Sequence, residues 1–410
     1  MNVNHRQYNL PNHPVVVICI DGCADEYLDC ALSLDKTPHL ARMIRDGWRG
    51  KARGALPSFT NVNNTSIVTG VAPSVHGIPG NFFINPENGE EVMMNSHEFI
   101  RCPDLLTAAQ REGRKVAFVT AKNKLRTLLG HHLVEAGGIA FSAEKAGDAT
   151  LANDNIEKVE ELVGYPTPPI YSADASLFVF RAGAALLEKG LADFLYLSTT
   201  DYLQHKFAPD APEMLAFHEA FDQALGRILA CGASVVITAD HGMNAKNNAD
   251  GTPKVLYLET LLNERFGEGT TRVICPITDP YVVHHGALGS YVQVHLGEAS
   301  PPGERVREVA DYLIRLEGVT EVLPRDLAAL KLELPLDRLG DLTVLSARDV
   351  ALGKTPADHD LSQLQGGLRS HGGRYEEMVP LISSQPLTGE LETLASADPR
   401  NFDAFKFACP

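Results

Sequence analysis

The sequence predicts an α/β fold with a doubly wound, mainly parallel sheet, and three observations lead to this fold class. Short runs of β-branched and apolar residues alternate with segments of helical periodicity, as in a sheet with crossover helices. The runs are apolar throughout, which suits strands that helices cover on both faces. Each run ends near Asp, His or Lys, at the edge where open α/β sheets bind ligands. The predicted strands are 14–21, 115–120, 193–198 and 234–238, with a final core strand at 378–382.

Start and stop signals place helices between these strands. The predicted helix 37–47 opens with a Thr cap and a Pro in its first position, and it ends at a Gly. The stretches 103–113, 172–189 and 212–230 are also predicted helices. The stretch 56–80 is rich in Pro, Asn, Ser, Thr and Gly but poor in charge, which favours a folded functional loop with a short helix over a linker.

The chain is long enough for a large domain and a smaller one, or for two to three domains. From about residue 271 the order of strand-like and helical segments changes, which predicts a smaller α+β cap inserted over the carboxyl edge of the sheet. We therefore expect residues 1–270 to form the first part of the core domain, 271–366 the cap, and 367–410 the last part of the core.

Composition narrows the classes of partner. The chain has 36 Lys and Arg against 52 Asp and Glu, a net charge of −16, which argues against nucleic-acid binding. No apolar run is long enough to span a bilayer, and the N-terminal residues lack a signal-peptide pattern. Seven scattered cysteines fit free thiols in a reducing cytoplasm. We expect a cytoplasmic protein without nucleic-acid or membrane partners, and the sequence leaves open whether it is a monomer or a homodimer.

Carboxylates and imidazoles at the predicted sheet edge indicate two adjacent metal sites. Asp201 and His205 are four positions apart, so on a helical turn both side chains face the same way, as paired metal ligands must. His371 lies in a glycine-bounded loop that can reach over the sheet edge. The two predicted ligand sets are Asp201, His205 and His371, and Asp21, Asp240 and His241. These donors suit two Zn²⁺ ions and would also accept Mn²⁺ or Fe²⁺.

Two divalent ions about 4 Å apart can hold both the attacking and the leaving group of an in-line phosphoryl displacement. A hydroxyl from the Asn- and Thr-rich stretch would supply the nucleophile, since metal coordination can make it an alkoxide near neutral pH. The candidates are Ser58 and Thr60. Taken alone, Thr60 is more typical of a loop residue that bonds its own backbone.

Other motifs have simpler explanations that the sequence leaves open. An N-capping Asp and a surface His would also account for Asp240 and His241. Lys122 and Lys124 follow a predicted strand and lie two positions apart. On an extended segment both side chains would point the same way and could bind an anion, but a solvated basic turn is the alternative.

The ordered motifs resemble those of the alkaline phosphatase superfamily of two-metal phospho-hydrolases, over most of the chain. Any single motif is weak, but the ordered set is specific. The motifs are Cys19-Ile-Asp21-Gly22, Phe59-Thr60 with Asn61 and Asn64, Thr69-Gly70, His76-Gly77-Ile78, Gly80-Asn81-Phe82, Asp201-x3-His205, Asp240-His241-Gly242-Met243 and Arg369-Ser370-His371-Gly372-Gly373. Within the superfamily the chain looks most like the phosphonoacetate hydrolase family, with nucleotide pyrophosphatase/phosphodiesterases as near relatives.

The resemblance implies a role for each matching residue. Each ligand set would hold one zinc, and the zinc held by Asp21, Asp240 and His241 would also bind the oxygen of Thr60. Asn81 would donate a hydrogen bond to a phosphonate oxygen. The implied substrate-binding residues are Thr60, Asn81, Lys122 and Lys124, with the lysines on the substrate carboxylate.

The implied reaction is hydrolysis of the P–C bond of phosphonoacetate, a small anionic substrate, to acetate and phosphate through a phosphothreonine at Thr60. The departing carbanion is tolerable only as an enediolate on the carboxylate, and two ammonium groups there would meet this charge as it develops. Two other functions stay open. The same site could hydrolyse phosphate esters, as nucleotide pyrophosphatase/phosphodiesterases do, or the protein could bind phosphonates in a metal-dependent way without chemistry.

Further histidines are assigned no catalytic role. The adjacent pairs His131–His132 and His284–His285 are predicted to have capping or structural roles. His218 lies in a charged helical stretch and is predicted to be exposed.

Overall fold

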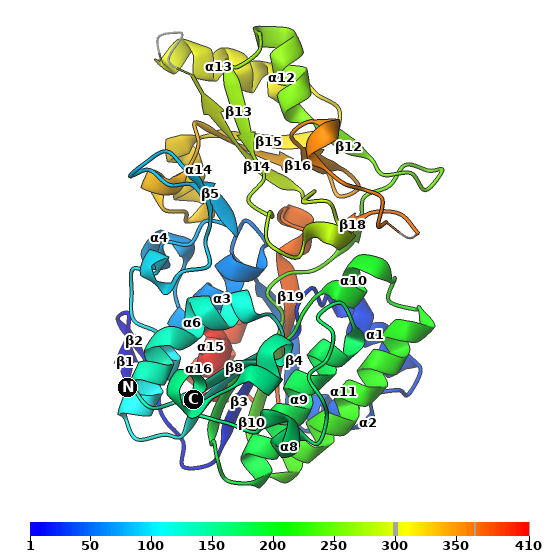
Figure 1. Cartoon of the computed structure of the whole chain (residues 1–410). Helices are drawn as coiled ribbons and strands as arrows, with labels where there is room; N and C mark the ends of the chain where they lie inside the picture. The colour runs from blue at the N-terminus through cyan, green and yellow to red at the C-terminus, as the bar shows by residue number, and fades with distance from the viewer. Residues whose placement is uncertain (298–301, 365, 410) are drawn as a thin grey trace.

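The computed structural model describes residues 1–297, 302–364 and 366–409. Figure 1 shows two lobes, the lower built around a seven-stranded sheet and the upper around a four-stranded sheet. Both ends of the described chain lie in the lower lobe. No helix of the described residues is long and apolar enough to cross a membrane.

The seven-stranded sheet confirms the predicted α/β core. Its order is β4–β19–β10–β3–β9–β7–β8, in which the last five strands run parallel and β4 and β19 are antiparallel to their neighbours. All five predicted strands are present. The bounds are β3 Val15–Cys19, β4 Trp48–Arg53, β7 Val116–Thr120, β8 Ile139–Ser142, β9 Phe194–Ser198, β10 Ser234–Thr238 and β19 Met378–Ser383.

Two strands of this sheet were not predicted. β4 lies at an edge and has the sequence Trp-Arg-Gly-Lys-Ala-Arg, whose charges are typical of a protected edge strand and hide any apolar alternation. β8 forms the opposite edge and has only four residues. By contrast, every residue of β3, β7, β9 and β10 is buried, as their continuous apolar runs predict.

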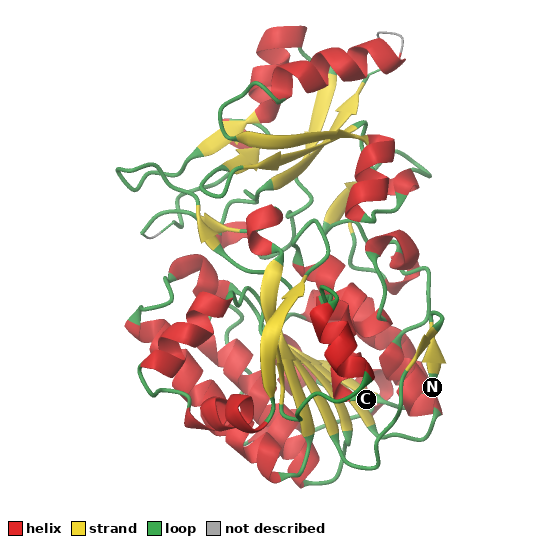
Figure 2. Cartoon of the chain, turned by 180° about the vertical axis from the view of Figure 1, so that it is seen from behind, coloured by secondary structure: helices red, strands yellow, loops and turns green. Residues whose placement is uncertain are grey.

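Helices cover both faces of the sheet, as Figure 2 shows from behind. Helices α9 and α11 pack together on one face, and α5, α6 and α16 pack on the other, together with α3. The four helices predicted from start and stop signals are confirmed, and the functional loop contains the buried helix α3. The bounds of the helices around this sheet are α2 Pro38–Asp46, α3 Thr60–Thr69, α5 Leu105–Arg111, α6 Asn123–Glu135, α9 Ala173–Glu188, α11 Pro212–Ala230 and α16 Ala404–Ala408.

The upper lobe is an antiparallel sheet of order β13–β14–β16–β15 with helices beside it. It has a hydrophobic cluster of its own, which also takes in Leu258 and Leu262 of the preceding helix α12 and reaches Phe59 in the lower lobe. The cap boundaries at residues 271 and 366 remain a prediction. The bounds are α12 Leu258–Phe266, β13 Thr271–Ile274, β14 Tyr291–Leu296, α13 Pro302–Leu313, β15 Val319–Pro324, α14 Arg325–Leu332 and β16 Leu342–Ser346.

The remaining elements are short. Four two-stranded pairs join β1 to β2, β5 to β6, β11 to β18 and β12 to β17. The strand bounds are β1 Asn2–Val3, β2 Arg6–Gln7, β5 Phe82–Ile84, β6 Glu91–Met93, β11 Asn244–Ala245, β12 Val255–Tyr257, β17 Ala351–Gly353 and β18 Arg369–Ser370. The helix bounds are α1 Asp25–Ser33, α4 Pro73–His76, α7 Leu151–Asp154, α8 Val159–Val163, α10 Tyr202–Lys206 and α15 Glu390–Ser396.

The expectation that His218 is exposed was wrong, because its side chain is fully buried. It lies on the same stripe of α11 as Met214, Phe217 and Phe221, which all face the core. Its Nδ1 donates to the carbonyl of Met214 at 2.8 Å, and its ring lies against Phe217. Of the neighbouring charges in the sequence, Glu219 lies on the solvated side of this helix, whereas Asp222 is buried as well and accepts from the backbone N–H groups of His39 and Leu40.

Candidate active site

Three carboxylates meet at the carboxyl edge of the sheet. Asp21, Asp201 and Asp240 follow β3, β9 and β10, which are neighbours in the sheet and run in register. All three side chains are buried. The apolar strand that ends in an acid, seen repeatedly in the sequence, therefore gathers the acids at one point of the sheet.

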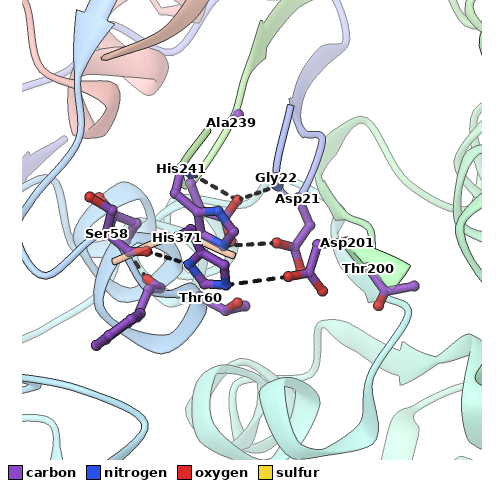
Figure 3. Close-up of polar contacts among 12 residues, drawn as sticks. Asp21, Gly22, Ser58, Thr60, Thr200, Asp201, Ala239, His241 and His371 are labelled. Atoms are coloured by element: carbon purple, nitrogen blue, oxygen red, sulfur yellow. Dashed lines mark hydrogen bonds and ion pairs between the residues drawn. The ribbon is translucent and has the colours of Figure 1, made fainter. Parts of the chain in front are cut away.

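The first predicted ligand set comes together around Asp201. His205, one turn later on α10, places its Nε2 2.9 Å from Asp201 Oδ2. His371 Nε2 lies 3.5 Å from the same oxygen, and Figure 3 shows this contact. His371 arrives there because β18, which precedes it, pairs with β11, and β11 begins two residues after Gly242.

The second predicted set lies directly beside the first. His241 Nε2 is 3.2 Å from Asp21 Oδ1 and 3.7 Å from Asp240 Oδ2. Asp240 is held by the backbone N–H of Gly22 at 3.2 Å and by Asn64 Nδ2 at 3.2 Å. Ligand atoms of Asp21, Asp201 and His241 lie within 4.8 Å of one another, so Asp201 belongs geometrically to both sets.

All three ring orientations are set by backbone carbonyls. His205 Nδ1 donates to the carbonyl of Arg369 at 2.7 Å, and His241 Nδ1 donates to the carbonyl of Gly242 at 2.8 Å. His371 Nδ1 donates to the carbonyl of Ser58 at 2.7 Å. This pattern places the proton on Nδ1 and leaves each Nε2 free to face the carboxylates. Metal-binding histidines are usually oriented by such a bond from the second nitrogen.

Unpaired buried atoms test whether cations fit this arrangement. Asp21 Oδ1, His205 Nε2 and His241 Nε2 are buried and have no hydrogen-bond partner, although carboxylate oxygens lie near both nitrogens. An orphaned buried polar atom usually costs about 1–3 kcal/mol. Asp21 Oδ1 and His241 Nε2 face each other in one ligand set and His205 Nε2 belongs to the other, and oxygen and imidazole nitrogen donors fit Zn²⁺, Mn²⁺ or Fe²⁺.

The electrostatics of the cluster point the same way. Burial and the Asp21 carboxylate raise the pKa of Asp240 to about 7. Burial alone would lower the pKa of His241, but Asp240 and Asp21 outweigh burial and raise that pKa to about 9. These shifts reflect crowded negative charge in a dry site, which bound cations would neutralise.

The two hydroxyl candidates differ in their bonding. Ser58 is committed to structure, because its Oγ donates to the carbonyl of Gly373 and its own carbonyl accepts from His371. Thr60 is the first residue of α3 and lies beside His371 (Figure 3). Among the described residues its hydroxyl takes part in no hydrogen bond, and only its carbonyl is engaged, by Asn64 Nδ2 at 3.0 Å. The geometry thus favours Thr60 over Ser58 as a reactive hydroxyl.

Asn81 lies next to the start of α3. Its Oδ1 accepts from the backbone N–H of Asn61 at 3.1 Å, one residue after Thr60. Its Nδ2 lies 3.3 Å from the carbonyl of Ile277, and the side chain is buried. Asn81 therefore presents an oriented amide beside the candidate nucleophile.

The expectation that Lys122 and Lys124 lie on an extended segment was wrong. Lys122 caps α6 and Lys124 lies in its first turn. Both side chains are nonetheless buried and converge, with ammonium nitrogens 5.7 and 5.6 Å from the ring centroid of Tyr281. Lys122 Nζ is 3.0 Å from Asp201 Oδ1, and Lys124 forms an ion pair with Asp279. A solvated basic turn is therefore excluded.

Sequence reasoning missed the contribution of the segment between β13 and β14. This irregular segment brings Asp279 and Tyr281 to the lysines. It also places His284 and His285 against His205, each with ring centroids 4.6 Å away. Both imidazoles are buried at the candidate site, whereas His131 and His132 lie on an exposed part of α6 near Glu135. The only sequence signal was a His–His pair within an apolar stretch.

Comparison with known proteins agrees with this geometry. The model of the type I phosphodiesterase / nucleotide pyrophosphatase family matches residues 15–374. The crystal structure of phosphonoacetate hydrolase from Sinorhizobium meliloti 1021 in complex with phosphonoacetate is similar with a TM-score of 0.93 and 44% identity, covering 100% of this chain and 98% of that chain.

More distant relatives share parts of the fold or sequence. Murine ectonucleotide pyrophosphatase/phosphodiesterase 5 is similar in fold, with a TM-score of 0.62 and 15% identity over 97% of this chain and 94% of that chain. Venom phosphodiesterase from Macrovipera lebetinus is 25% identical over 56% of this chain. The curated relatives are longer, and the match spans between 25% and 49% of their length. The chain therefore belongs to the type I phosphodiesterase / nucleotide pyrophosphatase family of the alkaline phosphatase superfamily, in the same branch as phosphonoacetate hydrolase.

Proposed function

We propose that this protein hydrolyses phosphonoacetate to acetate and phosphate. One observation carries the proposal: two buried ammonium groups, of Lys122 and Lys124, converge on Tyr281 beside the Asp/His cluster. A simple phosphodiester, such as a p-nitrophenyl diester, has no second anionic group that would need this pair. The full-length similarity to a phosphonoacetate hydrolase supports the same substrate. The seven free cysteines support a cytoplasmic location.

Two divalent cations, Zn²⁺ by preference, would be held by the two ligand sets. Asp201, His205 and His371 form one set. The other consists of Asp21, Asp240 and His241 with the Thr60 oxygen. Cations bound there neutralise phosphonate oxygens and lower the pKa of hydroxyl groups that bind them.

The residues of the chain supply the nucleophile and the orientation. Thr60 attacks phosphorus in line with the P–C bond, so that a Thr60 O–P bond forms as the P–C bond breaks and the proton of the Thr60 hydroxyl passes to solvent. Asn81, whose amide is oriented by the backbone of Asn61, donates to a phosphonate oxygen. The N-terminus of α3 adds a favourable dipole for the anion. Water then attacks the phosphothreonine, releases phosphate and restores the Thr60 hydroxyl.

Lys122 and Lys124 bind the carboxylate of the substrate. The electron pair of the broken P–C bond moves onto this carboxylate as an enediolate, which a proton from water converts to acetate. Because both ammonium groups are buried, they act on the developing charge in a medium of low dielectric constant. This is where the lysines lower the barrier.

Phosphate release by the metal-loaded protein tests the proposal. Phosphonoacetate and, separately, a p-nitrophenyl phosphodiester are offered to wild type, to Lys122→Ala/Lys124→Ala, and to Lys145→Ala, an exposed lysine that serves as the control. We expect wild type and Lys145→Ala to cleave phosphonoacetate. The double variant should lose this activity while it keeps the same metal content as wild type. Diester hydrolysis that is indifferent to the lysines, with phosphonoacetate inert, would instead assign the protein to the phosphodiesterase function that its family model suggests.

A further inference from the structure

The segment between β13 and β14 brings one carboxylate to Lys124, beside the candidate active site. Asp279 is 6% exposed. Its Oδ1 accepts from the backbone N–H of Tyr281 at 2.7 Å, which fixes the orientation of the carboxylate. Its Oδ2 forms the ion pair with Lys124 and lies 3.5 Å from Asn81 Nδ2. One rigid carboxylate therefore touches both a proposed carboxylate-binding group and a proposed phosphonate-binding group.

Lys124 and Asn81 differ in the donors that these contacts leave free. An ammonium group has three donors and a side-chain amide nitrogen has two. Asp279 takes one donor of Lys124 and shares Asn81 Nδ2 with the carbonyl of Ile277. Two donors of Lys124 therefore remain for a ligand, whereas a ligand oxygen at Asn81 has to share or replace one of the two long contacts of its Nδ2. The carboxylate of Asp279 lies between the two groups and sets their separation.

Asp279 also opposes a fall in the pKa of Lys124, which is lowered overall in this dry environment. Burial lowers the pKa of Lys124 and the ammonium of Lys122 lowers it further, while Asp279 acts in the opposite direction. The pKa of Asp279 itself is lowered by Lys124 and Lys122 despite its burial. Without this carboxylate, Lys124 would have an acidic neighbour only at longer range and its pKa would be lowered further, which disfavours the charged form that binds carboxylates.

We propose that Asp279 is a positioning residue that selects phosphonocarboxylates, by holding the Lys124 ammonium at a set distance from the phosphonate-binding Asn81. This inference rests on the proposed function of Lys124 and Asn81. The ion pair also ties the cap to the core, so a purely structural role is the alternative that the experiment must separate.

The experiment measures two properties of Asp279→Asn, Lys124→Met and the double variant. Calorimetry gives the affinity for phosphonoformate, a phosphonocarboxylate that binds without turnover being required. Kinetics give kcat and KM for phosphonoacetate and for a p-nitrophenyl phosphodiester, which has no carboxylate. Asp337→Asn is the matched control, because it removes the carboxylate of an exposed cap residue that pairs with Arg101.

We expect Asp279→Asn to weaken phosphonoformate binding and to lower kcat/KM for phosphonoacetate by roughly tenfold or more, as loss of a buried charge partner does. Diester hydrolysis should change by less than about threefold, because it does not use Lys124. In the Lys124→Met background Asp279→Asn should add almost nothing. Asp279→Glu, which keeps the charge, should recover part of the loss.

Equal losses on both substrates, or independent losses that add in the double variant, would overturn the proposal in favour of a structural role. Unchanged phosphonoformate binding in Asp279→Asn would overturn it as well. A different result would separate the two proposals. If wild type binds phosphonoformate and the variants lose this binding in the coupled way, but no protein cleaves phosphonoacetate, the proposed function fails while the role of Asp279 stands.

Discussion

The imidazole rings of His241 and His371 stack face to face, with centroids 3.5 Å apart and planes inclined by 6°. The two residues are distant in the sequence and belong to different predicted ligand sets. Because these rings are in contact, the two ligand sets are adjacent, and Asp201 lies close enough to contribute a ligand atom to either set. Two cations held by these sets would therefore be neighbours, as an in-line displacement requires.

Removal of metal should destabilise the protein as well as stop turnover. A ligand that binds only the folded state at 100 times its Kd contributes about 2.7 kcal/mol of stability. Dialysis against a chelator should therefore lower the Tm, and Zn²⁺ should restore it. Metal content by mass spectrometry should fall from about two ions per chain, the number of proposed sites.

The metal prediction has a matched pair of histidine variants. His205→Ala should lose metal, whereas His131→Ala, on the exposed part of α6, should retain it. If neither the chelator nor His205→Ala changed the Tm, the assignment of these residues as metal ligands would be contradicted.

Replacement of the two hydroxyl residues should separate chemistry from structure. Thr60→Ala should lower kcat by about 10³-fold or more, as loss of a nucleophile does. Ser58→Ala loses one buried hydrogen bond to the Gly373 carbonyl and should cost about 1 kcal/mol of stability, with most of the turnover retained. Rapid-quench detection of a phosphorylated chain in wild type, absent in Thr60→Ala, checks the intermediate. Full turnover by Thr60→Ala would exclude the covalent step.

Asn81 should matter for every substrate, unlike the lysines. Its amide is oriented toward the start of α3 by the backbone of Asn61 and by the Ile277 carbonyl. Asn81→Ala removes a donor to a phosphonate or phosphate oxygen and should lower kcat/KM by about 10²-fold for phosphonoacetate and for the diester alike. A loss confined to phosphonoacetate would place Asn81 at the carboxylate end instead.

The core and the cluster of acids could be predicted because their signals are local. β3, β9 and β10 are continuous apolar runs, and each is followed within a few residues by an acid. A parallel sheet then brings these acids together without further information. The spacing of Asp201 and His205 likewise encodes their shared face on α10.

The part of the site that comes from the segment between β13 and β14 could not be predicted, because its contacts are long-range. Asp279 and Tyr281 lie in a segment without periodicity, and their partner Lys124 is 155 positions from Asp279 in the chain. The conformation of the lysine segment was also misjudged, because α6 begins immediately after Lys122 and no proline or cap residue announces it. Such features depend on how the two lobes pack, which local patterns do not report.

A buried ion pair behind the His371 loop should be important for stability. Lys246 and Glu376 are both fully buried and lie 2.8 Å apart. Glu376 also accepts from the backbone N–H of Gly373, two residues after His371. Lys246→Met would leave the carboxylate without its cation and should cost about 3–5 kcal/mol. Urea denaturation of the metal-free protein measures this loss.

The exposed pair Arg227–Glu188 provides the comparison for Lys246. Both side chains are more than 40% exposed, so Arg227→Met should cost less than about 1 kcal/mol. If Lys246→Met were no more destabilising than Arg227→Met, the buried pair would have no special role in holding the His371 loop.

His218 predicts how stability depends on pH. Burial lowers the pKa of His218 from its ordinary 6.5 to about 4, because no carboxylate contacts this ring in the described structure. Between these values the unfolded chain binds a proton that the folded protein does not. Stability from this group is therefore present above pH 6.5 and is lost as the pH falls toward 4, by about 1.4 kcal/mol per pH unit. Urea denaturation of metal-free wild type and His218→Gln from pH 7 to 4.5 should show a shallower decline in the variant, and parallel curves would mean that His218 does not titrate as its burial predicts.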